Sequence, residues 1–296
     1  MLYHILVFLS DICCLLPASV ARFIGKILGE LTGTVVPKKR KQMAMHNIER
    51  CLKVSTDKAE QIAKKSWTRF GPMIMEVLRF KVICKNIDKY VTIKGEENIK
   101  KAISYGNGGV IATAHSGNWE IIGAALTHKG MKIAGVAQHQ RNEGVNNFIN
   151  YCRAFTGMHI TDKLDIKEMM KMLGQKYFIG LIMDQDGGST GIIMPFLGYE
   201  ASCVQGPAVM SRFKSAPILP AFITEDKKRP GHHILTVLEP VFTAKTKDKQ
   251  KDIYDMMASL TSLVEQHIRD YPEEWFWLHD RWKYVERKKK EANNLQ

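Results

Sequence analysis

The chain of 296 residues carries 43 Lys and Arg against 30 Asp and Glu, a formal net charge of +13, and 45% of its residues are hydrophobic. This apolar content, with only 25% charged residues, excludes an intrinsically disordered or low-complexity protein. The length suits one large domain or two small ones. A basic excess is typical of proteins that bind nucleic acid, anionic lipid headgroups or acidic proteins, and composition alone does not choose among them.

The N-terminal region has the pattern of two short helices. The apolar run 2–16 ends at Pro17, which leaves it shorter than the ~20 residues of a membrane span. Beyond Pro17, charged residues recur every four positions and fall on one face of an amphipathic helix: Arg22, Lys26 and Glu30. Small residues with the same spacing would let another helix approach closely: Ala21, Gly25, Gly29 and Gly33.

The basic cluster 38–41 follows this region directly, as is typical of the cytoplasmic side of a membrane anchor. We therefore predict that residues 1–36 form a membrane-anchoring helical hairpin broken at Pro17, with the rest of the chain in the cytoplasm. A soluble core helix is the alternative.

The remaining chain is predicted to be an α/β domain over residues 37–286, followed by a basic polar tail over residues 287–296. Residues 42–83 carry helical apolar spacing, and beyond Tyr90 short β-rich runs alternate with helical segments. This alternation predicts a sheet flanked by helices on both faces. The strands expected are 91–95, 108–114, 132–138, 177–184, 216–223 and 232–241, and the helices 118–128, 144–155, 166–175 and about 250–270.

Two of these strands end in polar residues suited to chemistry. The first runs into AHSGNWE (114–120), where we expect Asn118 to cap the following helix. Glu120 is predicted to hydrogen-bond one ring nitrogen of His115, which leaves the other as a base. A structural histidine is the alternative for an isolated pair. The second strand ends at Asp184 in DQDGG, and two such strand ends predict one shared crevice.

The C-terminal segment PEEWFWLHDRWK (272–283) holds three of the five tryptophans. Trp275, Leu278 and Trp282 would share one face of a helix, which favours core packing. The alternative is an aromatic and cationic rim at a membrane surface, with Arg281 and Lys283 as its cations. No serine elbow, P-loop, dinucleotide fingerprint or zinc spacing is present in the sequence, so we predict neither a metal nor a cofactor.

Together these segments resemble the late acyltransferases of lipid A biosynthesis, of the lauroyl and myristoyl type, within the lysophospholipid acyltransferase superfamily and its H-x4-D/E signature. The resemblance covers nearly the whole chain, in the family's order: MHNIERC, HSGNWE, QHQRNEGVNNFINYCR, GLIMDQDGGSTGIIMPFLG and PEEWFWLHDRWK. The family's Tyr-Arg-Pro element reads QHQR (138–141) here, its P-F-F-G reads PFLG (195–198), and Gly187 replaces the Pro that often follows D-Q-D. These departures leave the acceptor and the acyl chain open.

The resemblance implies acyl transfer from acyl carrier protein to a hydroxyl of a Kdo-bearing lipid A precursor, at the cytoplasmic face of the bacterial inner membrane. His115 is implied as the general base and Glu120 as its orienting, charge-stabilising partner. Arg153 would stabilise the oxyanion or bind a lipid phosphate, Asp184 would hold substrate or support that arginine, and Asn118 is assigned to substrate binding. The expected partners are the carrier protein, the anionic lipid precursor and the membrane surface, with neither metal nor cofactor.

Three other interpretations remain. The acceptor is open to another glycolipid, such as a phosphatidylinositol mannoside, or a lysophospholipid. A basic nucleic-acid-binding protein is a different class, but no helix-turn-helix, zinc-finger or RNA-binding signature is present in the sequence, so we predict no nucleic-acid partner. A pseudoenzyme scaffold at the membrane is disfavoured because both motif residues are intact.

Overall fold

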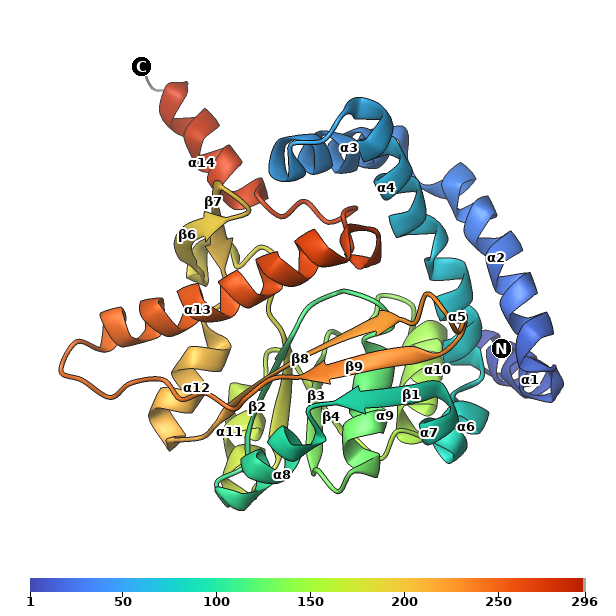
Figure 1. Ribbon diagram of the computed structural model, residues 1–296, viewed down its shortest axis with the longest axis horizontal. Coiled ribbons are helices and arrows are strands. Elements are labelled where there is room, and N and C mark those ends of the chain that lie inside the picture. Colours follow the sequence, from blue (N-terminus) through green and yellow to red (C-terminus); the bar gives the residue numbers. More distant parts are fainter. Residues whose placement is uncertain (295–296) are drawn as a thin grey trace.

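The structure is a computed structural model that describes residues 1–294, and its centre is a seven-stranded sheet with helices on both faces (Figure 1). The strand order is β1-β9-β8-β2-β5-β3-β4, and neighbours pair in parallel except for the antiparallel pair β8 and β9. The strands are β1 (Val91–Lys94), β2 (Gly109–Thr113), β3 (Ile133–Ala137), β4 (His159–Asp162), β5 (Phe178–Ile182), β8 (Ile218–Glu225) and β9 (His233–Val237). The predicted α/β sheet is therefore confirmed, and β4 is the strand that the sequence pattern missed.

Strand β2 shows why both faces of the sheet carry helices. Val110 and Ala112 belong to one hydrophobic core, whereas Ile111 between them belongs to the other. Every residue of β2 is buried, as expected for a parallel strand covered on both sides. The core around Ile111 includes residues of α8 (Glu96–Ser104), α9 (Glu120–His128) and α10 (Glu143–Ala154); the other core includes residues of α11 (Ile166–Gly174), α12 (Gly206–Lys214) and α13 (Lys249–Asp270).

A helical region leads into the sheet, and a small hairpin follows it. The region predicted as helical at 42–83 is confirmed as α3 (Lys38–Leu52), α4 (Thr56–Thr68), α5 (Phe70–Leu78) and α6 (Phe80–Ile83), and α7 (Ile87–Tyr90) completes it. Beyond β5, strands β6 (Ile192–Phe196) and β7 (Tyr199–Cys203) form an antiparallel hairpin apart from the main sheet. Sequence patterns did not predict this hairpin.

The two N-terminal helices pack on the body of the protein. Pro17 separates α1 (Leu2–Leu15) from α2 (Ala18–Val35), as predicted, but the helices do not form a hairpin: α1 packs chiefly on α10 and α2 on α5 and α4. The row of small residues explains this, because a Cβ at Gly25 would lie 2.8 Å from the Cα of Pro72 in α5. Within residues 1–294, no helix is both long enough and apolar enough to span a membrane.

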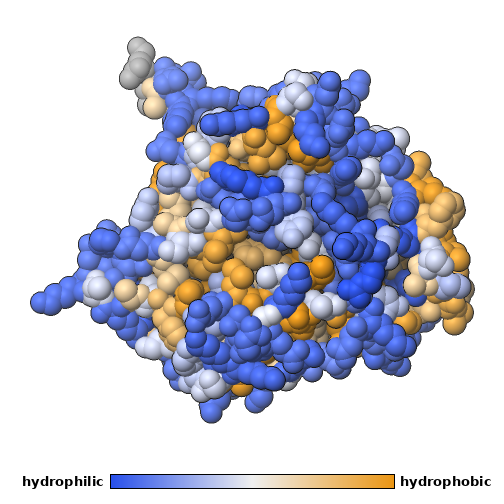
Figure 2. Space-filling view, viewed as in Figure 1, coloured by the Kyte–Doolittle hydropathy of each residue, from blue (hydrophilic) through white to orange (hydrophobic). Residues whose placement is uncertain are grey.

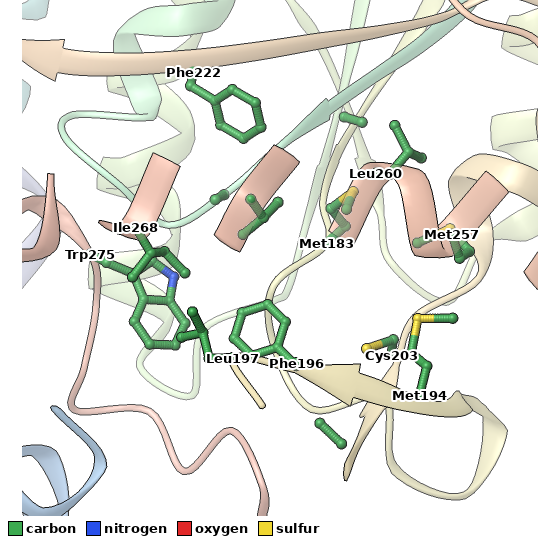
Figure 3. Packing of buried hydrophobic residues seen from close by; sticks show 14 of the residues in the cluster. Met183, Met194, Phe196, Leu197, Cys203, Phe222, Met257, Leu260, Ile268 and Trp275 are labelled. Atoms are coloured by element: carbon green, nitrogen blue, oxygen red, sulfur yellow. The ribbon is translucent and has the colours of Figure 1, made fainter. Parts of the chain in front are cut away.

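The C-terminal tryptophan segment belongs to the core. Past the short helix η3 (Pro272–Glu274) it is irregular, yet Trp275, Trp277 and Trp282 are buried, and Figure 3 shows Trp275 beside Phe196 and Leu197. The core-packing interpretation is therefore confirmed, although the predicted helix is absent.

The proposed membrane rim is wrong for Arg281, which is only 1% exposed. Its guanidinium donates to the carbonyl of Ser202 at 2.6 Å and to Sγ of Cys203 at 2.8 Å. Most of the predicted polar tail lies in helix α14 (Lys283–Asn293), and its residues from 287 to 294 are exposed. Its last two positions, 295 and 296, lie outside the described residues.

Candidate active site

The chain segments after β2 and β5 meet because these strands are parallel neighbours in the sheet. His115 follows β2, and Asp184 follows β5. Nδ1 of His115 lies 2.7 Å from Oδ1 of Asp184, and the backbone N–H of His115 donates to Oδ2 at 2.8 Å. The structure thus brings together the two strand ends that the sequence placed in one crevice.

Asp184 is a buried carboxylate with three nitrogen partners. In addition to His115, Nε1 of Trp275 donates to its Oδ2 at 2.6 Å. Burial alone would raise the pKa of Asp184, but the charge of His115 and hydrogen bonds from His115 and Trp275 outweigh it and lower the pKa. The ionised carboxylate then accepts the Nδ1 proton of His115, which leaves Nε2 as the basic nitrogen.

Nε2 of His115 lies in a polar and aromatic setting. The side-chain nitrogen of Gln185 is 3.4 Å away, and the ring of Trp119 packs edge-on against the imidazole at a centroid distance of 4.9 Å. His279 is nearby and stays neutral, since burial lowers its pKa to about 4 and its Nε2 accepts the backbone N–H of Asp186. The side chain of His115 remains 17% exposed, so it is accessible from solvent.

Glu120 does not orient His115, contrary to the sequence prediction. Its carboxylate forms a two-pronged ion pair with Arg153 on α10, with distances of 2.9 Å to Nε and 2.7 Å to Nη2. Burial opposes the charge on Arg153, but Glu120 outweighs it and raises the pKa of the guanidinium. The pairing follows from the topology: Glu120 begins α9 and meets α10, whereas Asp184 follows the strand beside β2. Arg153 is therefore engaged by Glu120.

Asn118 is not a helix cap, again contrary to the prediction. Helix α9 begins after Trp119, whose side chain makes no capping hydrogen bond. The amide of Asn118 instead donates to Oε2 of Glu76 on α5 at 2.7 Å, and Oε1 of Glu76 lies 3.1 Å from Nε2 of His233. Only the backbone carbonyl of Asn118 serves the helix, by accepting the N–H of Ile121.

Sequence reasoning missed several residues that hold the motif loop. His267 on α13 bonds Oγ of Ser116 at 2.8 Å, and burial lowers its pKa to about 4, so it is neutral. Arg69 donates to the carbonyl of Gly117 at 2.7 Å. Trp275 was visible as part of a tryptophan cluster, but its bond to Asp184 was not. His267 and Arg69 stand in ordinary helical contexts, which carry no sequence signal for this role.

A small pocket of about 80 Å³ lies beside the ion pair of Glu120 and Arg153, between the sheet and α9. Its lining is mostly apolar and includes three glycines: Gly123, Gly135 and Gly180. The missing side chain at Gly123 lets Met158 pack against α9, because a Cβ there would lie 1.9 Å from its Sδ. The volume is below the ~300–1,000 Å³ of common small-molecule sites, so only part of a long ligand fits without movement of the walls.

An imidazole aligned by a buried carboxylate, at the strand ends of an α/β sheet, is the arrangement of an enzyme that uses general-base catalysis. Residues 1–284 match the model of the bacterial lipid A biosynthesis acyltransferases, and the chain belongs to that family. It is thus an acyltransferase, as its motifs predicted.

Individual relatives are distant. The lipid A biosynthesis lauroyltransferase of Escherichia coli K12 is 24% identical over 90% of this chain and 87% of its own length, and the palmitoleoyltransferase is 21% identical over 90% and 86%. Phosphatidylinositol mannoside acyltransferase of Mycobacterium tuberculosis CDC 1551 is 22% identical over 70% of this chain, and the match spans 64% of that protein. The crystal structure of the 1-acyl-sn-glycerophosphate acyltransferase PlsC from Thermotoga maritima aligns with a TM-score of 0.40 at 15% identity over 88% of this chain and 99% of that one, too weak to support an argument.

Proposed function

We propose that this protein transfers a fatty acyl group from the thioester of acyl carrier protein to a hydroxyl of a lipid A precursor, with His115 as the general base. The observation that carries the proposal is the hydrogen bond from Nδ1 of His115 to buried Asp184, which leaves Nε2 to accept a proton. Family membership supports the reaction class and the lipid acceptor.

The reaction begins with the acceptor hydroxyl against Nε2 of His115. As its oxygen attacks the thioester carbonyl, Nε2 takes the hydroxyl proton, and Asp184 stabilises the imidazolium that forms. Collapse of the tetrahedral intermediate breaks the C–S bond, and His115 returns the proton to the departing thiolate. The new ester remains on the acceptor, and neither metal nor covalent acyl-enzyme takes part.

Glu120 and Arg153 act in this proposal as a clamp beside the acyl chain. Their ion pair joins α9, which begins directly after the motif loop, to α10. The glycine-lined pocket beside the pair suits the part of the acyl chain nearest the thioester, because its lining is mostly apolar. We assign Arg153 no part in stabilising the oxyanion, because Glu120 already engages its guanidinium.

The outer faces of α1 and α2 form the proposed membrane-binding surface, at the cytoplasmic face of the inner membrane. Phe8 and Phe23 are each 65% exposed, and apolar side chains cover this edge of the molecule, at the right in Figure 2. An amphipathic helix with such a face lies in the membrane interface rather than across it. The basic cluster 38–41 directly follows these helices and suits anionic headgroups.

The surface is tested with the double variant Phe8→Asp/Phe23→Asp in co-sedimentation with vesicles that contain anionic lipid. Binding should fall at least ~10-fold, because burial of two phenylalanines contributes about 3–6 kcal/mol. The control is Leu164→Asp, the same kind of change at a side chain that is 81% exposed and lies between β4 and α11. Equal binding of both variants would contradict the proposed surface.

The enzymatic proposal is tested with acyl carrier protein loaded with fatty acyl groups and a panel of acceptors. The purified His115→Ala variant should lose ~10²–10⁴-fold in rate while its circular dichroism matches wild type. The control is His128→Ala, which removes an exposed histidine paired with Asp88. A folded His115→Ala protein with wild-type rate would refute the mechanism.

The panel of acceptors includes a second class of lipid. The relatives named phosphatidylinositol mannoside acyltransferases are as similar to this chain as the lipid A enzymes, although over less of it. A phosphatidylinositol mannoside is therefore tested beside the Kdo-bearing lipid A precursor. Turnover of the phosphatidylinositol mannoside alone would reassign the acceptor, but it would leave the reaction and the role of His115 unchanged.

A further inference from the structure

A second and larger cavity, of about 370 Å³, adjoins the motif loop between α2, α4 and α5. Its lining includes Gly117 and Asn118 of the loop, Lys26 of α2, Lys65 of α4, and Arg69 between α4 and α5. We call it the basic cavity. None of its cations has a role in the mechanism above.

Buried polar atoms without a partner concentrate around the basic cavity. Within residues 1–294, eleven buried side-chain nitrogen and oxygen atoms lack a hydrogen-bond partner, and five of them belong to residues that line it. An unsatisfied buried group costs about 1–3 kcal/mol, and the number of such groups here marks the wall of this cavity as unusually polar. The five atoms are Nε of Arg22, Nε and Nη2 of Arg69, Oδ1 of Asn118 and Nδ1 of His233.

Most of these atoms are hydrogen-bond donors. The guanidinium nitrogens of Arg22 and Arg69 only donate. Burial lowers the pKa of Arg69 to about 10, which keeps it charged at neutral pH. Glu76 raises the pKa of His233 against the opposing effect of burial, which favours the imidazolium form with a proton on Nδ1. The polar wall of the cavity is therefore richer in donors than in acceptors, which favours an anion over a cation beside it.

The acidic side chains around the cavity have partners of their own. Glu225 pairs with Arg22 at 2.5 Å, Glu76 with His233 at 3.1 Å, Glu30 with Lys64 at 3.1 Å and Glu273 with Lys227 at 3.1 Å. Burial raises the pKa of Glu274 and favours its neutral form.

Three of the basic side chains that line the cavity have no acidic partner. Among the described residues, Lys26, Lys65 and Arg69 form no ion pair with an acidic side chain. The lining holds four Lys and Arg side chains and five glutamates, so the uncompensated positive charge is local to the part of the cavity formed by these three cations.

We propose that the basic cavity binds a phosphate group of the acceptor lipid, held by Arg69, Lys26 and Lys65; this subsite depends on the proposed acyl transfer to a lipid. Two aspects of its position support a headgroup as the source. Lys26 lies on α2, the helix whose exposed Phe23 and Ile27 belong to the proposed membrane-binding surface. A lipid whose chains enter the membrane along α2 would present its headgroup here.

The cavity also lies close to the base. The guanidinium of Arg69 is over the ring of Trp119, 5.8 Å from its centroid, and that ring packs against His115. A phosphate bound at Arg69 would fix the attached sugar near Nε2 of His115. Phosphate binding would thus select which hydroxyl is acylated.

The kinetic test compares one acceptor with and without its phosphate group, using the double variant Lys26→Gln/Lys65→Gln. KM for the phosphorylated acceptor should rise at least ~10-fold, since each charge-assisted hydrogen bond contributes about 1.5–3 kcal/mol. KM for the dephosphorylated acceptor should equal that of wild type. The matched control is Lys58→Gln, an exposed lysine of α4 that does not line the cavity.

A binding measurement separates this proposal from the enzymatic one. Isothermal titration calorimetry with glucosamine 1-phosphate, inorganic phosphate and glucosamine needs no turnover, so it decides the subsite even if acyl transfer to lipid A fails. Binding of glucosamine 1-phosphate to wild type and Lys58→Gln, but not to Lys26→Gln/Lys65→Gln, supports the proposal. Binding of inorganic phosphate alone would overturn the headgroup assignment, and equal results for both lysine variants would overturn the site.

Discussion

The bond from Trp275 to Asp184 allows a sharp test of how the dyad is held. Trp275→Phe keeps an aromatic ring against Phe196, whose centroid lies 5.8 Å away, but removes the N–H that Oδ2 accepts at 2.6 Å. We expect the carboxylate to lose its fixed orientation toward Nδ1 of His115. Trp275 is thus a positioning residue that acts through Asp184.

The magnitude follows from the kind of bond removed. A hydrogen bond to a buried charged group contributes about 1.5–3 kcal/mol. Each 1.4 kcal/mol or so in the barrier is about tenfold in rate, so kcat should fall by roughly 10–100-fold if alignment of the dyad depends on this bond. The pKa of Asp184 is lowered partly by Trp275, so it should rise in the variant, and activity should be lost at a higher pH as the solution is acidified.

The neighbouring tryptophan is the control. Trp277 is 1% exposed, and its indole N–H donates to the carbonyl of Pro272 at 2.8 Å. Trp277→Phe should cost about 1 kcal/mol of stability with no change in the pH profile. The assay is kcat and kcat/KM against pH, with thermal unfolding of both variants. Equal kinetics and pH profiles for the two variants would refute the positioning role of Trp275.

Three further outcomes are expected from the packing and charge of the structure. Gly29→Ala should lower stability by about 1–2 kcal/mol in thermal unfolding, because its Cβ would strike a backbone carbonyl of α4. Gly33→Ala should be neutral or slightly stabilising, because its Cβ would make only an ordinary contact of 3.4 Å with Nε1 of Trp67. The ion pair between Glu76, whose pKa is lowered, and His233, whose pKa is raised, stabilises the fold most between about pH 4.5 and 6.5. The contribution of the pair is lost as pH rises through the folded pKa of His233, or falls through that of Glu76. The difference in unfolding free energy between wild type and His233→Gln should therefore shrink by about 1–2 kcal/mol from pH 6 to pH 9. A constant difference would show that the pair is not ionised. Glu120→Gln should leave the guanidinium that it neutralises partly uncompensated and lower the free energy of unfolding by about 3 kcal/mol; unchanged unfolding would argue against the clamp between α9 and α10.

Local patterns were sufficient to predict much of this fold. The apolar run GGVIATA predicted β2 because a parallel strand buried on both faces needs apolar side chains at successive positions. The small residues of α2 predicted a close helix contact because spacing of four keeps them on one face, although the partner proved to be α5. His115 was placed at a strand end because strand and turn are both short-range features.

The partners of these residues were decided by tertiary structure. His115 and Asp184 are 69 residues apart, and they meet because β2 and β5 became neighbours in the sheet. Glu120, only five residues from His115, meets Arg153 instead, because the first turn of α9 faces α10.

The sequence by itself determined most strands of the main sheet, several of its helices and the polar residues that follow β2 and β5, because hydrophobic periodicity and turn chemistry act over a few neighbouring residues. Only the tertiary structure decided that Trp275 bonds the carboxylate of Asp184, that Arg281 is buried, and that Arg69 and His233 line one cavity. These contacts join residues far apart in the chain, and they depend on the order of strands and the packing of helices, which no local pattern specifies.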